Sequence, residues 1–285
     1  MKKRYIASTA SVVLALTLAA CSSGDDGEGT ASAALSHIHG LGIDPADGRL
    51  YVATHQGVYT PDDNGDPQLV GDRQDDFMGF TITKAGTFVA SGHPAPGRDA
   101  PGNLGLIEST DAGKTWKNKS LSGEVDFHSL DYANDTIYGY DSTNGLLRVS
   151  KDGVRWDERG QLQALDIAAS PNDRNTILAT TQDGVAKSTD GGKAFEAGAQ
   201  PVMALISWAT PDALYGIDPS GTLHRSADGG INWAKAGTVP GGQPQALEAV
   251  NSKHILAATQ DGVFESKDGG ETFTQRLASA SVGNP

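Results

Sequence analysis

Short runs of alternating hydrophobic and polar residues recur through the chain from residue 37 onward, separated by turns rich in Gly, Asp and Asn. A period of two is typical of half-buried β-strands. The runs come in units of roughly 40 residues, which indicates a repeat architecture. The first run of each unit occupies residues 37–44, 76–83, 126–133, 161–168, 201–208 and 243–250. The second run occupies residues 49–59, 86–94, 136–145, 176–185, 213–222 and 254–263.

A Ser-X-Asp-X-Gly turn that ends in an aromatic residue follows the third run of most units. Four full copies lie at 109–116, 188–195, 226–233 and 266–273, with a shortened copy at 150–156 and a degenerate one near Thr60. In such a turn the Asp side chain caps backbone amides, Gly adopts a positive φ and the aromatic residue packs beneath the turn. The motif therefore predicts a hairpin between the third and fourth strands of each unit.

Six four-strand units without long gaps predict an all-β domain over residues 36–280, a six-bladed β-propeller with four-stranded antiparallel blades. Radial repetition is the natural closure because it leaves only short, protected sheet edges. The glycine content, 36 of 285 residues, is high for a globular protein and suits many tight turns. The one insertion, PAPGRDAPGN at residues 94–103, follows the second run of the second unit.

The turn motif resembles the Asp-box, or BNR repeat, of β-propellers in sialidases, sortilin-like receptors and photosystem II assembly factors. This resemblance covers nearly the whole domain and implies the same propeller architecture. The chain is also similar to bacterial lipoproteins and secreted proteins described as glycosyl-hydrolase-like or BNR-repeat proteins. The stretches that carry this similarity are HIHGLGID, LYVATHQGVY, MGF, SGHP, LGLIESTDAGKTW and DFHSL.

The first residues have the pattern of an export signal. A basic start, Lys2 to Arg4, precedes a mostly apolar stretch at 6–20 that is too short for a membrane span. The sequence Leu-Ala-Ala-Cys that ends at Cys21 resembles a bacterial lipobox. We therefore expect a lipoprotein signal peptide at 1–20, lipidation of Cys21 and an acidic flexible tether at 21–35. The expected location is the cell membrane, lipid-anchored and facing outside the cytoplasm.

The charge and cysteine content exclude several classes of protein. The net charge of −13 repels phosphate backbones, so nucleic acid is not an expected partner. A single cysteine excludes a disulfide framework within the chain and a cysteine-based zinc or iron–sulfur site. The apolar content suffices for one sizeable core, and we expect a monomer.

In propellers of this type the first strand is innermost, so its first and third positions line one mouth of the central channel. The second strands end at the same face, where His55 and His93 lie. Position one holds His37, Asp76 and Asp126 in the first three units. Position three holds, in chain order, His39, Met78, His128, Gln163, Met203 and Gln245. The sequence thus predicts that most of its seven histidines gather at one mouth.

Imidazole and thioether donors together suit a soft or borderline metal ion, copper first. His37 and His39 project from one side of a strand, about 7 Å apart at their Cα atoms, and suit one ion if the rings converge. Asp76 and Asp126 serve as further ligands or orient the histidines. The predicted metal ligands are His37, His39, Met78, His128, Met203, His55 and His93. The leading interpretation is a non-catalytic cell-surface binding protein whose cofactor, if any, is copper.

Three alternatives remain open. His39 and His128 also suit an inert channel plug held by hydrogen bonds, with methionines as gap-fillers. A glycoside hydrolase acting on carbohydrate would use Asp76 and Asp126 as its carboxylate pair, although the arginine triad and Arg-Ile-Pro signature of sialidases are not found. An assembly factor or scaffold would instead bind a membrane protein through the propeller surface.

Overall fold

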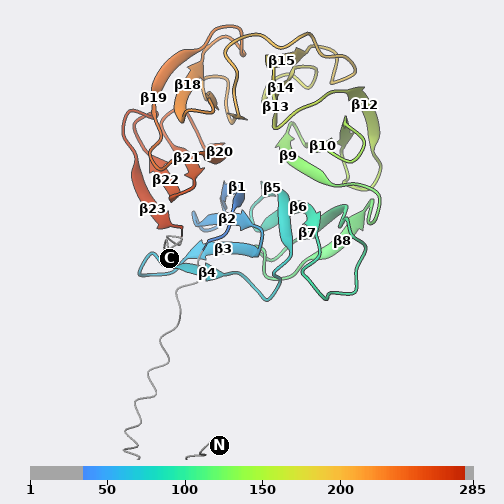
Figure 1. Ribbon diagram of the computed structural model, residues 1–285. Helices are drawn as coiled ribbons and strands as arrows, with labels where there is room; N and C mark the ends of the chain where they lie inside the picture. The colour runs from blue at the N-terminus through green and yellow to red at the C-terminus, as the bar shows by residue number, and fades with distance from the viewer. Residues whose placement is uncertain (1–34, 280–285) are drawn as a thin grey trace, which may run out of the picture. The chain divides into compact units, whose positions relative to one another are not determined.

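The computed structural model describes residues 35–279, which form six antiparallel sheets around a central axis (Figure 1). Each sheet is a blade built from consecutive strands, and the innermost strand comes first in the chain. The predicted all-β, six-bladed propeller is confirmed. The predicted signal peptide, Cys21 and nearly all of the tether lie outside the described residues. Among the described residues, no helix is long and apolar enough to cross a membrane.

The strands are short and follow the alternating runs. Blades 1 and 2 hold β1 (Ile38–Ile43), β2 (Leu50–Thr54), β3 (Gly57–Pro61), β4 (Pro67–Leu69), β5 (Asp76–Lys84), β6 (Thr87–His93), β7 (Leu106–Ser109) and β8 (Lys117–Ser120). Blades 3 and 4 hold β9 (Phe127–Ala133), β10 (Thr136–Asp141), β11 (Leu146–Ser150), β12 (Asp157–Gln161), β13 (Ile167–Ala169), β14 (Ile177–Thr181) and β15 (Gly184–Ser188). Blades 5 and 6 hold β16 (Leu205–Trp208), β17 (Leu214–Ile217), β18 (Thr222–Ser226), β19 (Ala234–Thr238), β20 (Pro244–Ala249), β21 (Ile255–Thr259), β22 (Gly262–Ser266) and β23 (Thr274–Ala278).

Blade 4 differs from the four-stranded pattern because its outer strand is reduced to one bridge. Strands β13, β14 and β15 pair as expected, and Val185 then pairs with Ala199 alone. The segment that holds Ala199, Glu-Ala-Gly-Ala-Gln, contains three small residues and no β-branched residue. Such a composition forms strands poorly. The other five blades have the expected four strands.

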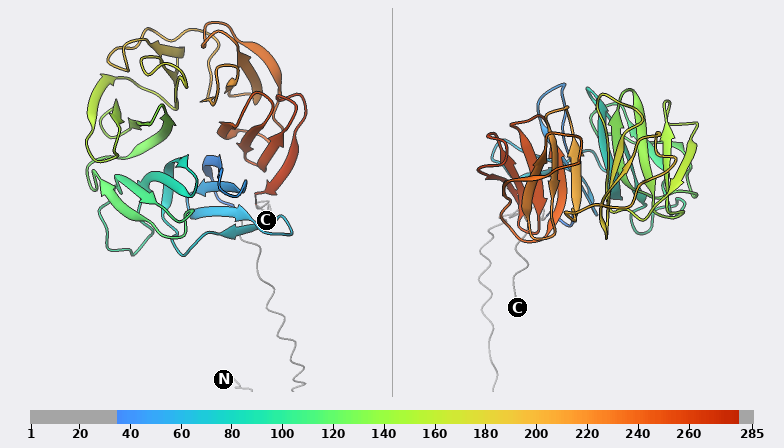
Figure 2. Two further views of the ribbon diagram at one scale, coloured as in Figure 1. Left: turned by 180° about the vertical axis from the view of Figure 1, so that it is seen from behind. Right: turned by 90° about the horizontal axis from the view of Figure 1, so that it is seen from above.

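The hydrophobic core lies between neighbouring blades. Tyr51 of blade 1 packs with Phe77 and Phe88 of blade 2, and equivalent apolar clusters join the other blades. The ring closes in the same way, because Ile38 of blade 1 shares a cluster with Leu277 of blade 6. The two views of Figure 2 show the blades standing side by side around the ring. A parallel bridge between Leu35 and Ser279 adds backbone pairing to this closure.

The Ser-X-Asp-X-Gly turns have the geometry that their sequence predicts. In blade 5, buried Ser226 accepts a hydrogen bond at Oγ from the Gly230 amide at 2.9 Å. Asp228 caps the turn by accepting from the Asn232 amide at 2.8 Å. Gly230 adopts a φ of 88°, and the Trp233 ring donates to its carbonyl oxygen. These turns lie at the far ends of strands that start near the histidines, so they belong to the opposite face.

Replacing Ser226 with alanine is expected to lower the free energy of unfolding by about 1–2 kcal/mol. The substitution leaves the half-buried Gly230 amide without its acceptor and removes the hydroxyl that donates to Asp228. Thermal unfolding measures the effect as a fall in Tm of a few degrees. Ser220→Ala is the matched control because its hydroxyl is exposed, and equal shifts in both variants would contradict the expected role of the turn.

Candidate metal centre

Antiparallel pairing brings three histidines of blade 1 to one edge of the sheet. His37 and His39 lie at the start of β1, and His55 follows the end of β2. Because Ile38 pairs with Thr54, the His55 amide donates to the His37 carbonyl at 3.2 Å. The register of one hairpin therefore places all three imidazoles at the channel mouth.

These three side chains, His37, His39 and His55, form what we call the tri-imidazole group. His37 Nδ1 lies 3.4 Å from His39 Nε2, which lies 3.4 Å from either ring nitrogen of His55. One ligand nitrogen from each ring can be chosen so that all three lie within 4.8 Å of one another. Asp76 Oδ1 lies 2.8 Å from His55 Nδ1 and orients that ring. Such a set can hold one metal ion.

Two rings of this group, His37 and His39, are kept in the neutral form that binds metals. Burial, together with the neighbouring His37 and His55 rings, lowers the pKa of His39 to about 3. Burial also lowers the pKa of His37, with a further contribution from His55. At neutral pH both rings therefore offer a lone pair instead of a second proton.

Three side chains of blades 2 and 3, His93, Asp126 and His128, form what we call the His-Asp-His group. His93 ends β6, while Asp126 and His128 flank Phe127 at the start of β9. Asp126 Oδ2 accepts from His128 Nε2 at 2.7 Å and lies 3.5 Å from His93 Nε2. The hydrogen bond to Asp126 raises the pKa of His128. Burial alone raises the pKa of Asp126, but the hydrogen bond and charge of His128 bring it below its usual value.

A β-bulge decides which position-three residues face the channel. In blades 1, 2, 3 and 6 the first strand skips one residue in its pairing with the second strand. Bulges redirect a side chain and occur often beside functional sites. The skipped residues are His39, Met78, His128 and Gln245, and all four line the central cavity.

Met203 does not join the mouth, and its predicted place in the ring is wrong. Its side chain is fully buried in the core cluster of Ile206 and Leu214. Its sulfur packs so closely against Gly216 that a Cβ there would lie 3.0 Å away. The pairing of β16 with β17 starts only at Leu205 and has no bulge, so Met203 points between the blades. Gln163 likewise precedes β13 and does not line the cavity.

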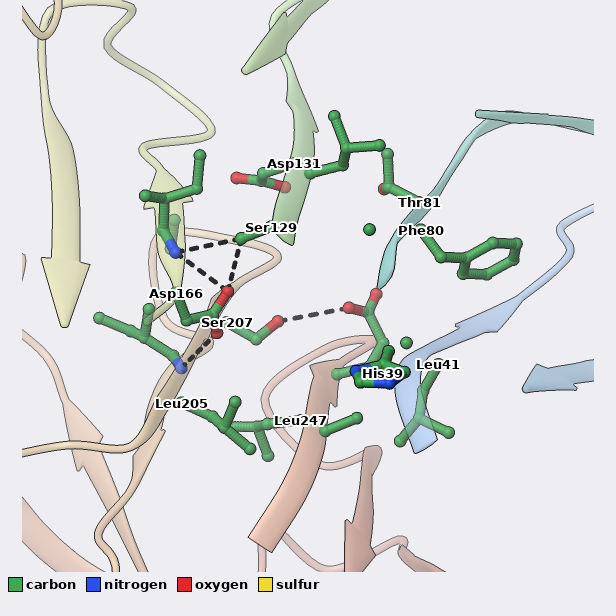
Figure 3. Close-up of a pocket in the computed structure, with 18 of the residues that line it drawn as sticks. His39, Leu41, Phe80, Thr81, Ser129, Asp131, Asp166, Leu205, Ser207 and Leu247 are labelled. Carbon is green, nitrogen blue, oxygen red and sulfur yellow. Dashed lines mark hydrogen bonds between the residues drawn. The ribbon is translucent and has the colours of Figure 1, made fainter. Parts of the chain in front are cut away.

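The central cavity, about 290 Å³ in volume, contains three carboxyl groups that sequence reasoning missed (Figure 3). Asp131, Asp166 and Glu248 line it together with His39, Met78 and His128. The acids hold the same place in their first strands, five residues after position one, and this alignment is the signal that could have revealed them. A strict period of two puts that place on the opposite face from position three, and in blades 3 and 6 the bulge reverses this for Asp131 and Glu248.

Two of these acids, with Ser207, bind the backbone of the next blade. Asp131 accepts from the Ala169 amide at 2.7 Å, and Asp166 accepts from the Ile206 amide at 2.9 Å. Ser207 accepts from the Ala249 amide at 2.9 Å. Glu248 has only a long contact of 3.5 Å with the Ser207 hydroxyl. Burial in the cavity, reinforced by the charges of Asp131 and Asp166, raises the pKa of Glu248 to about 8.

The two remaining histidines and Asp75 lie outside both groups. His224 contacts Asp218 at 3.0 Å and His254 contacts Glu265 at 2.7 Å, which gives each of these histidines a carboxylate partner on its own blade. Buried Asp75 contacts Arg98 and accepts at Oδ1 from the Ala95 amide. Asp75 therefore anchors the 94–103 insertion.

Comparison with known proteins gives structural neighbours only. No protein-family model and no curated protein sequence matches the chain. YCF48 bound to a D1 peptide has a TM-score of 0.53 at 16% identity, with coverage of 85% of this chain and 83% of that chain. The virginiamycin B lyase from Staphylococcus aureus has a TM-score of 0.53 at 13% identity, with coverage of 85% and 92%.

Two GH74 enzymes are also similar in structure. The xyloglucanase from Xanthomonas campestris has a TM-score of 0.54 at 17% identity, with coverage of 85% of this chain and 38% of that chain. An ancestral GH74 enzyme has a TM-score of 0.55, and 40% of it is covered. The chain thus spans about two fifths of the length of these enzymes. Enzymes and a peptide-bound protein share this architecture, and at these identities the likeness establishes that the chain is a β-propeller.

Proposed function

We propose that this protein is a non-catalytic binding protein that holds a transition-metal ion, copper first, in the tri-imidazole group. The observation that carries the proposal is the convergence of His37, His39 and His55, with ligand nitrogens within 4.8 Å of one another. Imidazole ligands suit copper, nickel, zinc and iron, and a nearby thioether favours Cu(I). Met78 lines the same cavity as His39, which supports copper as the first choice.

The surroundings of the tri-imidazole group support the same function. Asp76 accepts from His55, as outer carboxylates do for metal-bound histidines. The lowered pKa values of His37 and His39 remove the competition from protons at neutral pH. Asp76 and Asp126 are the carboxylate pair of the glycosidase alternative, but each already accepts from an imidazole. The copper-binding function therefore accounts for the positions of both the histidines and these carboxylates, whereas the glycosidase alternative accounts for the carboxylates alone.

We further propose that the turns are Asp-box repeats and that lipidated Cys21 anchors the propeller outside the cytoplasm. The turn geometry supports the first point, and the lipobox-like sequence before Cys21 supports the second. The structure of YCF48 with a D1 peptide makes a peptide-binding scaffold the second candidate, since both chains are covered almost fully. In that case binding of the partner would not depend on the histidines.

The test is a competition titration with a chromophoric Cu(I) chelator, together with metal analysis of the purified protein. Wild-type protein is expected to take up at least one Cu(I) per chain with high affinity. A His37→Ala/His39→Ala double variant, which removes two of the three tri-imidazole ligands, is expected to lose this affinity by more than about 100-fold, beyond what outer-sphere partners contribute. His224→Ala is the matched control, since that histidine pairs with Asp218 away from the mouth. Weak Cu(I) binding by the wild type, or equal binding by the double variant, would overturn the proposal.

A further inference from the structure

We infer that the His-Asp-His group is a second metal centre, separate from the tri-imidazole group, which binds a borderline divalent ion of the Zn²⁺ class. The inference deepens the proposed function by adding an ion of another kind at the same mouth. It rests on its own residues, His93, Asp126 and His128, whose ligand atoms lie within 4.8 Å of one another.

The buried carboxylate of Asp126 has an oxygen without a partner. Only 5% of Asp126 is exposed, and no hydrogen-bond donor among the described residues reaches Oδ1. The other oxygen, Oδ2, contacts His128, His93 and the Ser142 hydroxyl. A buried polar atom without a partner is costly and rare in folded proteins. A cation beside this carboxylate would satisfy it.

His93 presents a lone pair to the same carboxylate. Its Nδ1 lies 2.9 Å from the Gly102 carbonyl oxygen, which can only accept, so Nδ1 carries the proton. In the neutral ring Nε2 is then an acceptor, and it lies 3.5 Å from Asp126 Oδ2. Two acceptors that face each other at this distance leave room for a shared cation. A backbone carbonyl on the distal nitrogen is also how metal-bound histidines are oriented.

The 94–103 insertion gains a role in this arrangement. Gly102 belongs to the insertion, which Asp75 anchors through Arg98 and the Ala95 amide. The insertion therefore holds the carbonyl that sets the tautomer of His93. In blade 1, where β2 ends at Thr54 just before His55 and no insertion follows, Asp76 orients the His55 ring instead.

The donor set indicates the kind of ion. Two imidazoles and one carboxylate bind Zn²⁺ or Fe²⁺ and leave coordination positions open. The tri-imidazole group suits copper better, because its donors are three imidazoles and Asp76 acts by accepting from His55. His128 lines the 290 Å³ cavity, so an ion that it ligates lies at the cavity wall. The second centre would hold a water molecule or a small ligand at its open positions.

The experiment uses the full chain. It measures Co²⁺ binding by absorption spectroscopy and Zn²⁺ binding by competition with Co²⁺. Wild-type protein is expected to show Co²⁺ d–d absorption. His93→Ala and Asp126→Asn are expected to lose Co²⁺ and Zn²⁺ affinity by more than about 100-fold and to keep Cu(I) affinity. His93 is exposed, so its variant tests the site even if Asp126→Asn unfolds. His224→Ala is again the matched control.

The opposite variant separates the two proposals. His55→Ala is expected to weaken Cu(I) binding and to keep the Co²⁺ bound by the second centre. Wild-type protein that binds Co²⁺ but not Cu(I) would overturn the copper site and leave the second centre supported. Three outcomes would overturn the second centre. They are no Co²⁺ binding by the wild type, Co²⁺ binding that is unaffected by His93→Ala and Asp126→Asn, and loss of Co²⁺ binding in His55→Ala.

Discussion

Replacement of Asp166 by alanine is expected to lower the free energy of unfolding by about 3–5 kcal/mol. The carboxylate accepts hydrogen bonds from the Ser129 hydroxyl at 2.7 Å, the Ile167 amide at 2.9 Å and the Ile206 amide at 2.9 Å. These donors belong to blades 3, 4 and 5, so one side chain joins three blades (Figure 3). Alanine would leave the Ile206 amide and the hydroxyl without an acceptor inside the protein.

Denaturant unfolding followed by tryptophan fluorescence measures this effect. Asp183→Ala is the matched control because Asp183 lies in an exposed turn of the same blade, where a change within about 0.5 kcal/mol is expected. Asp166→Asn, which keeps an acceptor oxygen, is expected to fall between the two. If Asp166→Ala cost no more than Asp183→Ala, the carboxylate would not be holding the blades together.

The architecture could be predicted from the sequence because two local signals agree. The period-two runs gave all six innermost strands, and the turn at Ser226 has the hydrogen bonds that its residues dictate. The outer strand of blade 4 was predicted wrongly since only Ala199 of its segment pairs with Val185. The outermost strand packs on one neighbour alone, so poor strand formers there are not compensated.

The candidate site could be predicted only in part because strand register is not a local property. Counting by position placed His39, Met78 and His128 correctly at the channel. The same count failed for Met203, since β16 pairs with β17 without the bulge found in four other blades. The bulges also turn Asp131 and Glu248 into the cavity, which no period of two can anticipate. The contact between His93 and Gly102 depends on the conformation of the insertion, which no repeat specifies.

Glu248 differs from the other two cavity acids in its partners. Asp166 accepts three hydrogen bonds and Asp131 accepts from two backbone amides. Within residues 35–279, the Glu248 carboxylate accepts one hydrogen bond, a long one of 3.5 Å from the Ser207 hydroxyl. A carboxylate so poorly compensated in this cavity favours its neutral form. Ionised Asp166 therefore stabilises the fold through its hydrogen bonds, whereas ionised Glu248 destabilises it.

Glu248→Gln is accordingly expected to stabilise the metal-free protein at alkaline pH and to leave it unchanged at acid pH. Burial and the charges of Asp131 and Asp166 raise the pKa of Glu248 from 4.5 to about 8 in the folded protein. Between these two values the unfolded chain releases the proton while the folded chain keeps it, so wild-type stability falls as the pH rises. The loss is complete above the folded pKa and is on the order of 5 kcal/mol, since each pKa unit corresponds to about 1.4 kcal/mol.

Denaturant unfolding of the wild type and Glu248→Gln, in chelator, from about pH 5 to about pH 9 measures this difference. The two free energies of unfolding are expected to be similar at the acid end, where Glu248 is neutral in both states, and to diverge up to about pH 8. Burial raises the pKa of Asp131 to about 6, but this acid titrates in both proteins and cancels in the difference. Glu271→Gln, at an exposed turn, is the control. Parallel curves for wild type and Glu248→Gln would mean that Glu248 is already ionised in the fold, and its charge would then have to be balanced inside the cavity.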